Sequence, residues 1–311
     1  MGSNDLKFSE NLNTLLTFVR EQRPVFWRGI ENTIAFDRDG FASAANPLVD
    51  WAADYLGSDF HVQLADGYAF LVMELAKSQA VYQKAGKYPN SSYDEVYEAT
   101  YNNPEFMTNY HWGLYMATFA WPHHIKIFRF FEREFISKFG DESGLLLDLG
   151  SGSGVWSKLF ISSNPNWRGL GVDISETSVN EANAMVSAMT SSSKIKYVLG
   201  DALDYSTDEP ADAVISSFLL EHLENPRSLL ENVSRNLKPK GFAFVTGALT
   251  AAEIDHISEF RYESELVILA EESGLRVLDL CSANPSAYKD SDKYIPRSLG
   301  MVLQKRTQET W

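Results

Sequence analysis

Apolar and polar positions follow two different patterns along the chain, and the pattern changes near residue 140. Beyond that point, short apolar runs typical of strands buried on both faces are separated by segments with the spacing of amphipathic helices. The strands predicted from these runs are residues 145–149, 169–172, 195–199, 212–218, 242–246, 276–281 and 298–304. A helix is predicted between successive strands up to the sixth, and Gly274 ends the last of these helices, at 264–273. This alternation predicts an α/β fold with a doubly wound, mostly parallel sheet.

The N-terminal part of the chain has helical spacing throughout. Leu12, Leu15, Leu16 and Val19 recur at the period of one helix face, and residues 70–82 are mostly apolar over a helical length. Residues 140–144, Gly-Asp-Glu-Ser-Gly, form a polar, flexible link of the kind found between domains. We therefore predict an all-helical domain over residues 1–140 and an α/β domain over residues 141–311.

The first predicted strand ends in a glycine-rich turn. Asp148 is followed by Gly150, Gly152 and Gly154 at alternate positions, and a helix can begin at Val155. Glycine permits positive φ and a close approach of the backbone to a ligand, and a helix N-terminus suits a nucleotide. The dinucleotide pattern G-x-G-x-x-G has a different spacing, and an acid beside the loop disfavours a pyrophosphate. The turn therefore favours a nucleotide-like ligand that carries no pyrophosphate.

Acids also follow the next two strands. Asp173 comes about 20 residues after the glycines, where a carboxylate can accept hydrogen bonds from ribose hydroxyls. Ile174 beside it could lie against an adenine face. Asp201 and Ala202 follow the third strand, and Ser217 lies at the end of the fourth.

Together these residues resemble the motifs of class I S-adenosylmethionine (SAM) dependent methyltransferases of the small-molecule type, over about residues 141–311. The resemblance implies a Rossmann-like sheet of seven strands with the last one antiparallel, and SAM as cofactor. It implies that Asp201 takes the adenine amino group, that Ala202 lets the purine approach, and that the end of the fourth strand borders the methionine part of SAM. Residues 237–241 resemble the helix end and tight turn that many members have there. The cofactor-binding residues expected are Asp148, Gly150, Ser151, Gly152, Gly154, Asp173, Ile174, Asp201, Ala202 and Ser217.

The composition of the chain limits the kinds of methyl acceptor that we expect. The formal net charge of −15 argues against nucleic acid, because a protein that binds phosphates needs basic surface. The single cysteine, Cys281, excludes an intramolecular disulfide. No apolar stretch is long enough to span a membrane, and residues 1–5 have no signal character, so we expect a cytoplasmic protein. A small, partly apolar metabolite of a specialised (secondary) pathway is the acceptor expected, with a protein as the alternative.

Residues 101–135 are crowded with aromatic side chains and predict either packing against the sheet or a lid over the substrate. Methyl transfer is an in-line SN2 displacement that depends first on alignment. A base is needed where the acceptor arrives protonated, and histidine suits neutral pH. The catalytic candidates are His222 at the end of the fourth strand, and His111 with Tyr110 in the lid. Asp255 and His256, after the fifth strand, are further candidates for the base.

Other chemistries are less consistent with the sequence. His123 and His124 are the one closely spaced histidine pair, and neighbours on a helix point to different sides, so no metal site is expected. A nicotinamide-dependent oxidoreductase disagrees with the glycine spacing. A SAM-binding protein with chemistry other than methyl transfer remains an alternative, because cofactor motifs report binding and not reaction. The helical domain could support a homodimer.

Overall fold

Seven strands form one mixed sheet in the order β3-β2-β1-β4-β5-β7-β6. The computed structural model of the protein describes residues 6–100, 103–189, 194–285 and 293–306, so residues 1–5 and the first two residues of the aromatic segment lie outside it. Six strands run parallel, and β7 pairs antiparallel with both β5 and β6, which confirms the predicted sheet. The strands are β1 (Leu145–Leu149), β2 (Arg168–Asp173), β3 (Ile195–Leu199), β4 (Ala211–Ser216), β5 (Leu237–Leu249), β6 (Leu275–Ala283) and β7 (Arg297–Lys305).

Helices cover both faces of the sheet. The alternation of side chains along β1 sends Leu146 into the core on the side of α8 (Val155–Ser163) and α9 (Glu176–Ala188). Leu147 and Leu149 enter the core on the opposite side, with α10 (Pro226–Asn236) and α11 (Glu263–Glu272). The strand order reverses between β1 and β4, and ligands of such sheets bind beyond the carboxyl ends of the strands at that point.

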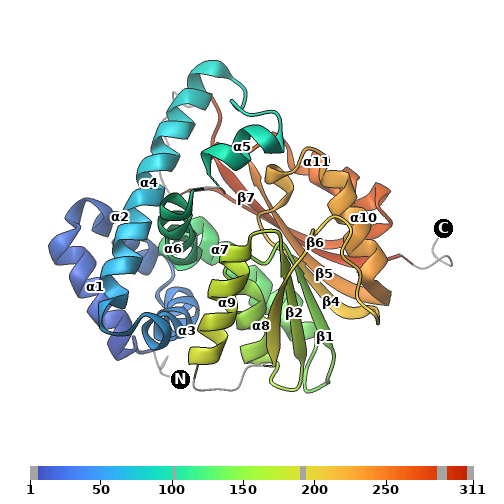
Figure 1. The fold of residues 1–311 in the computed structure, drawn as a ribbon, viewed down its shortest axis with the longest axis horizontal. Coiled ribbons are helices and arrows are strands. Elements are labelled where there is room, and N and C mark those ends of the chain that lie inside the picture. Colours follow the sequence, from blue (N-terminus) through green and yellow to red (C-terminus); the bar gives the residue numbers. More distant parts are fainter. Residues whose placement is uncertain (1–5, 101–102, 190–193, 286–292, 307–311) are drawn as a thin grey trace.

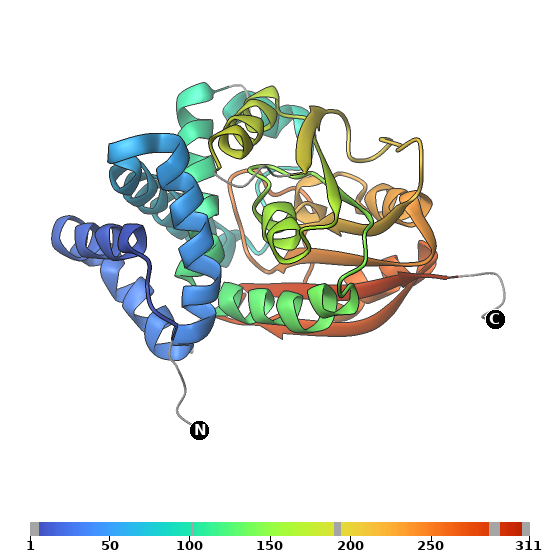
Figure 2. The ribbon, with the colours of Figure 1, turned by 90° about the horizontal axis from the view of Figure 1, so that it is seen from below.

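The N-terminal part is helical, and Figures 1 and 2 show its helices gathered on one side of the sheet. Aromatic packing joins the two parts: Phe131 and Phe135 lie 4.8 Å and 5.7 Å from the Phe244 ring of β5. The boundary at residues 140/141 remains a prediction. The α-helices are α1 (Glu10–Gln22), α2 (Pro24–Phe36), α3 (Arg38–Leu56), α4 (Phe60–Ala85), α5 (Tyr93–Ala99), α6 (Pro104–Ala120) and α7 (Pro122–Phe130). Short turns of other helix types are η1 (Gly57–Asp59), η2 (Phe131–Phe135), η3 (Ile136–Lys138) and η4 (Leu220–His222).

The helix predicted between the third and fourth strands is wrong. Residues 200–210, all of which the structure describes, form turns and no helix. The carboxylate of Asp201 accepts a hydrogen bond from the Leu203 N–H at 2.9 Å. Such a bond starts a turn in competition with a helix, and the polar residues that follow supply no apolar face.

The tight turn predicted at residues 237–241 takes a different form. Leu237 already pairs with Ala211, so the segment belongs to β5. The register then shifts, and Lys240 adopts a φ of 63°. The turn is therefore absorbed into the strand as an irregularity, and Lys240 takes the positive φ that favours glycine.

Candidate active site

The glycine turn after β1 lies at the reversal of strand order. Gly150, Gly152 and Gly154 have φ values of 70°, 50° and 70°. A Cβ on Gly154 would overlap the side chain of Tyr197, so this position needs glycine for packing. A Cβ on Gly152 would meet no atom within 4 Å, so Gly152 faces open space. The glycine turn is thus packed against Tyr197 at Gly154 and open to solvent at Gly152.

Asp173 ends β2 and holds the glycine turn. Its Oδ2 accepts a hydrogen bond from the Gly152 N–H at 2.7 Å, and its Oδ1 accepts one from the Ser175 N–H at 2.9 Å. Burial raises the pKa of Asp173, against the effect of these two hydrogen bonds. The next side chain, Ile174, is 54% exposed. Contact of Asp173 with the ribose and of Ile174 with the adenine remains a prediction.

Asp201 and Ala202 follow β3 as predicted. Asp201 is exposed, whereas Ala202 is buried and its carbonyl accepts from the Asn232 side chain at 2.8 Å. The nearby helix α5 contributes Tyr93. Burial, together with the charges of Asp173 and Asp201 among others, raises the pKa of Tyr93, so α5 lies beside the predicted adenosine site.

Asp148 lies on the buried side of the glycine turn and not on its open side. It is 2% exposed, and burial raises its pKa to about 7 although Ser157 donates to it. Lys158 of α8 is also buried, with its Nζ against Met185, and burial lowers its pKa to about 7. A contribution of Asp148 to cofactor binding remains a prediction.

The end of β4 is held by β5. The Thr246 hydroxyl lies 3.0 Å from the Ser217 hydroxyl and accepts a hydrogen bond from the Phe218 N–H at 2.8 Å. Phe218 has a φ of 52°, a strained value for a residue other than glycine. A Cβ on Gly150 would overlap Leu219, so the turn after β4 packs directly against the glycine turn.

Buried acids and histidines meet beside that turn. Tyr110 of α6 donates hydrogen bonds to Glu253 at 2.6 Å and to Asp255 at 3.0 Å. His222 Nδ1 lies 3.3 Å from the Asp255 carboxylate, and the His222 and His256 rings are 4.8 Å apart. The structure therefore brings the predicted Tyr110 and His222 into one cluster with the loop after β5.

Electrostatics distinguish the members of this cluster. Burial lowers the pKa of His222, but the carboxylate of Asp255 and two further acids outweigh it and raise the pKa to about 10. Burial raises the pKa of Glu253, whereas His222 holds the pKa of Asp255 below its usual range against burial. Burial lowers the pKa of His256 to about 3. His222 therefore keeps its proton at neutral pH and His256 carries none.

His111 lies apart from this cluster and has a different partner. Its Nδ1 contacts a carboxylate oxygen of Glu181 in α9, and the side chain is largely buried. Its Nε2 is buried with no hydrogen-bond partner among the described residues. His111 and His222 both contribute to the field at Asp173, so both lie near the end of β2.

Two features of the turn suit SAM, and the contact expected of Ser151 remains a prediction. The space beside Gly152 is open. The Ser151 hydroxyl oxygen is buried without a hydrogen-bond partner in the described parts of the chain, on the side of Gly171 in β2. Ile174 and Leu199 expose 54% and 58% of their surface at the ends of β2 and β3, where an adenine ring can cover them.

Comparisons with known proteins agree with this fit. Residues 146–241 match the family model described as methyltransferase domain. A stretch of 179 residues is 29% identical to the biotin biosynthesis bifunctional protein BioHC of Teredinibacter turnerae, covering 51% of this chain and 31% of that protein. A stretch of 112 residues is 30% identical to a ubiquinone biosynthesis O-methyltransferase of Rickettsia bellii, covering 35% and 45%. The chain thus spans about a third to a half of the length of these relatives.

One solved structure shares the fold over most of the chain. The pyocyanin biosynthetic protein PhzM superposes with a TM-score of 0.53 at 16% identity, covering 79% of this chain and 72% of that one. At this identity the likeness concerns the fold alone. Within the described residues, no helix has the length and apolar character needed to cross a membrane.

Proposed function

Because the chain contains a class I SAM-dependent methyltransferase domain, we propose that it transfers the SAM methyl group to a hydroxyl oxygen of a small, partly apolar metabolite. Oxygen is favoured over nitrogen, carbon or sulfur because the methyltransferases among the similar curated proteins are named as O-methyltransferases. The net charge of −15 supports a small acceptor over nucleic acid.

The observation that carries this proposal is the pair His111 and Glu181. A carboxylate can only accept, so the Nδ1 of His111 holds a proton, and in the neutral imidazole its Nε2 holds the lone pair. That Nε2 is buried and has no hydrogen-bond partner in the described chain. A base whose far nitrogen is oriented by a carboxylate is the arrangement that activates a hydroxyl nucleophile.

When bound, SAM supplies a methyl group on a sulfonium sulfur. His111 Nε2 accepts the proton of the acceptor hydroxyl as the oxygen attacks the methyl carbon. The carbon–sulfur bond breaks, its electron pair stays on sulfur, and S-adenosylhomocysteine is the product. Glu181 stabilises the imidazolium that forms, and Asp173 keeps the glycine turn in place.

Tyr110 and His222 have supporting roles in this proposal. His222 is a poor base at neutral pH, because the neighbouring carboxylates raise its pKa to about 10 after burial has lowered it. Tyr110 donates to Glu253 and Asp255 and so orders the loop after β5 beside the acceptor. Of the three catalytic candidates, His111 is therefore the base that we propose.

The test is to incubate the protein with labelled SAM and a panel of phenols, alcohols, amines and thiols, and to measure S-adenosylhomocysteine. We expect methylation of a hydroxyl compound. His111→Asn should lower kcat by about 10²–10⁴-fold and leave the Kd for SAM within about threefold. The matched control is His61→Asn, in α4, which should leave both unchanged.

Three results would contradict the proposal. SAM that is bound but never consumed with any acceptor would favour a SAM-binding protein of another chemistry. Methylation confined to amines or thiols would overturn the choice of oxygen. An unchanged kcat in His111→Asn would remove His111 as the base.

A further inference from the structure

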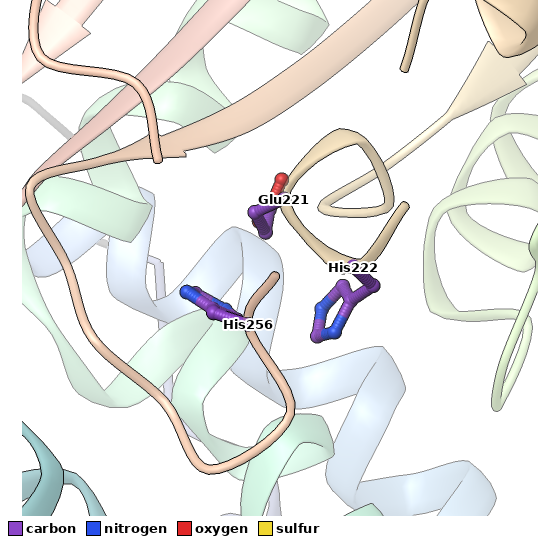
Figure 3. Close-up of side chains that lie close together, drawn as sticks. All are labelled: Glu221, His222 and His256. Carbon is purple, nitrogen blue, oxygen red and sulfur yellow. The ribbon is translucent and has the colours of Figure 1, made fainter. Parts of the chain in front are cut away.

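Three potential metal ligands meet where the turn after β4 approaches the loop after β5. Glu221 and His222 come from the turn, and His256 comes from the loop (Figure 3). Each offers one ligand atom, and these atoms all lie within 4.8 Å of one another. Two of the three side chains, Glu221 and His256, are 1% exposed.

Backbone hydrogen bonds fix the two segments to each other. The Glu221 carbonyl accepts from the N–H groups of Ile257 and Ser258 at 2.8 Å and 2.9 Å. The Ser258 hydroxyl donates to the Leu223 carbonyl at 2.6 Å. The three ligand side chains therefore rest on a rigid frame, which a binding site needs.

The hydrogen bonds of the two histidines leave one ring nitrogen of each for a ligand. His256 Nδ1 lies 2.7 Å from the Ala251 carbonyl oxygen, which can only accept, so the proton is on Nδ1 and the lone pair is on Nε2. His222 Nδ1 faces the Asp255 carbonyl and carboxylate in the same way, so its Nε2 is the atom left for an ion, which must displace the proton of the imidazolium to bind there. A histidine that donates one ring N–H to a carbonyl or carboxylate is the usual orientation of a metal-ligating histidine.

Glu221 provides an independent sign that something is to be bound. Its Oε2 is buried and has no hydrogen-bond partner among the residues that the structure describes. A buried carboxylate oxygen without a partner carries a large free-energy cost. Glu253 and Asp255 also lie beside His256, with the Glu253 carboxylate 4.0 Å from His256 Nε2, so three carboxylates share this region. Such a group of acids favours a cation.

We propose that Glu221, His222 and His256 bind one divalent first-row transition-metal ion. Two imidazoles and one carboxylate suit such ions and leave coordination positions open. Ligand atoms about 2.1 Å from a shared ion lie at most about 4.2 Å apart, which is compatible with three atoms that all lie within 4.8 Å of one another.

The ion would hold the oxygen of the acceptor. His222 is the least buried of the three ligands, and the turn that carries it packs against the glycine turn through Leu219. An acceptor oxygen on an open coordination position would be polarised beside the methyl donor, and its proton would pass to His111. This role rests on the proposed methyl transfer, whereas the binding of the ion does not.

The experiment is to strip the full-length protein with a chelator and titrate it with Co²⁺, followed by visible d–d absorption, and with Zn²⁺, followed by calorimetry. We expect one ion per chain. Glu221→Gln and His256→Asn should each weaken binding by at least about 10–100-fold. The matched controls are Glu231→Gln on the exposed face of α10 and His61→Asn, which should bind as the wild type does. Circular dichroism checks that each variant is folded.

The wild-type titration can refute the proposal without any variant, because absence of saturable binding of both ions overturns it. Unweakened binding in Glu221→Gln or His256→Asn overturns the ligand assignment. S-adenosylhomocysteine is measured in parallel with and without chelator. If the protein turns over fully with chelator and binds no ion, the metal site is refuted and the proposed methyl transfer stands. If it binds the ion but turns over no acceptor, the metal site stands and the proposed methyl transfer is refuted.

Discussion

Gly152 offers the cleanest test of the SAM site, because the fold needs this glycine only for its backbone conformation. Its φ is 50°, and a Cβ would meet no atom within 4 Å. Gly152→Ala should therefore lower the free energy of unfolding by only about 1–2 kcal/mol, the cost of a left-handed residue with a side chain. The added methyl group occupies the space proposed for SAM, so the Kd should rise at least about 100-fold, or about 2.7 kcal/mol.

A matched control separates the two effects. Gly57, the first residue of η1 and directly after α3, has a φ of 71° and also faces open space. Gly57→Ala should lower the free energy of unfolding at least as much, because φ 71° with ψ −146° is a conformation that essentially only glycine adopts, and it should leave the Kd unchanged. Gly154→Ala should destabilise the protein more strongly, because its Cβ would overlap Tyr197.

The assays are urea denaturation for stability and calorimetric titration with S-adenosylhomocysteine for affinity. The product avoids turnover during the measurement. If Gly152→Ala binds S-adenosylhomocysteine as tightly as the wild type, the open space above the glycine turn is not the cofactor site. An equal loss of affinity in Gly57→Ala would show that strain alone explains the effect.

Three further changes test the surroundings of the site. Asp173→Asn should raise the Kd for S-adenosylhomocysteine at least about 10-fold in calorimetry, because the carboxylate that holds the Gly152 N–H is lost; an unchanged Kd would contradict this role. Burial lowers the folded-state pKa of Lys158 to about 7 from 10.5, so the unfolded state binds more protons between these values and stability should rise with pH across that window, by up to about 4 kcal/mol. Lys158→Met should remove most of this slope in urea denaturation at about pH 7 and pH 9.5, and an equal slope would refute the assignment. Thr246→Val should lower the free energy of unfolding by about 1–3 kcal/mol, since it leaves the Phe218 N–H unpaired, and a neutral result would mean that this bond is replaced.

The sheet was predictable because its signals are local. Each buried strand is a short apolar run such as Leu145–Leu149, and the glycine turn follows it directly. The helix predicted between β3 and β4 failed because regular alternation was extended over residues 200–210, where the Asp201 side chain starts a turn instead. The tight turn predicted at residues 237–241 takes a different form because pairing with β4 extends β5 through this segment.

The partners of the catalytic candidates were harder to predict. Glu181 fits a capping box with Ser178 in the sequence, whereas its carboxylate contacts His111, seventy positions away. That contact depends on how α6 packs beside α9, which no local pattern encodes. The cluster of Glu221, His222 and His256 had a usable signal, because β4 and β5 are neighbours in a parallel sheet and the segments after them must meet. Histidine spacing alone could not reveal it, because the two histidines come from different loops and the third ligand is a glutamate.

His111 and His222, the two histidines near Asp173, have opposite electrostatic environments, and this difference affects how each contributes to the reaction. His111 faces one carboxylate, and its buried Nε2 has no hydrogen-bond partner among the described residues. His222 lies among three carboxylates, which keep its ring protonated and positively charged. A deprotonated acceptor oxygen needs both a proton acceptor and a nearby positive charge, and neither histidine supplies both. His111→Asn and His222→Asn should therefore impair different steps. At higher pH the loss of the base should be partly recovered, because more acceptor is already ionised, whereas the loss of positive charge should not be. Equal recovery of both variants would mean that the two histidines do not divide the work in this way.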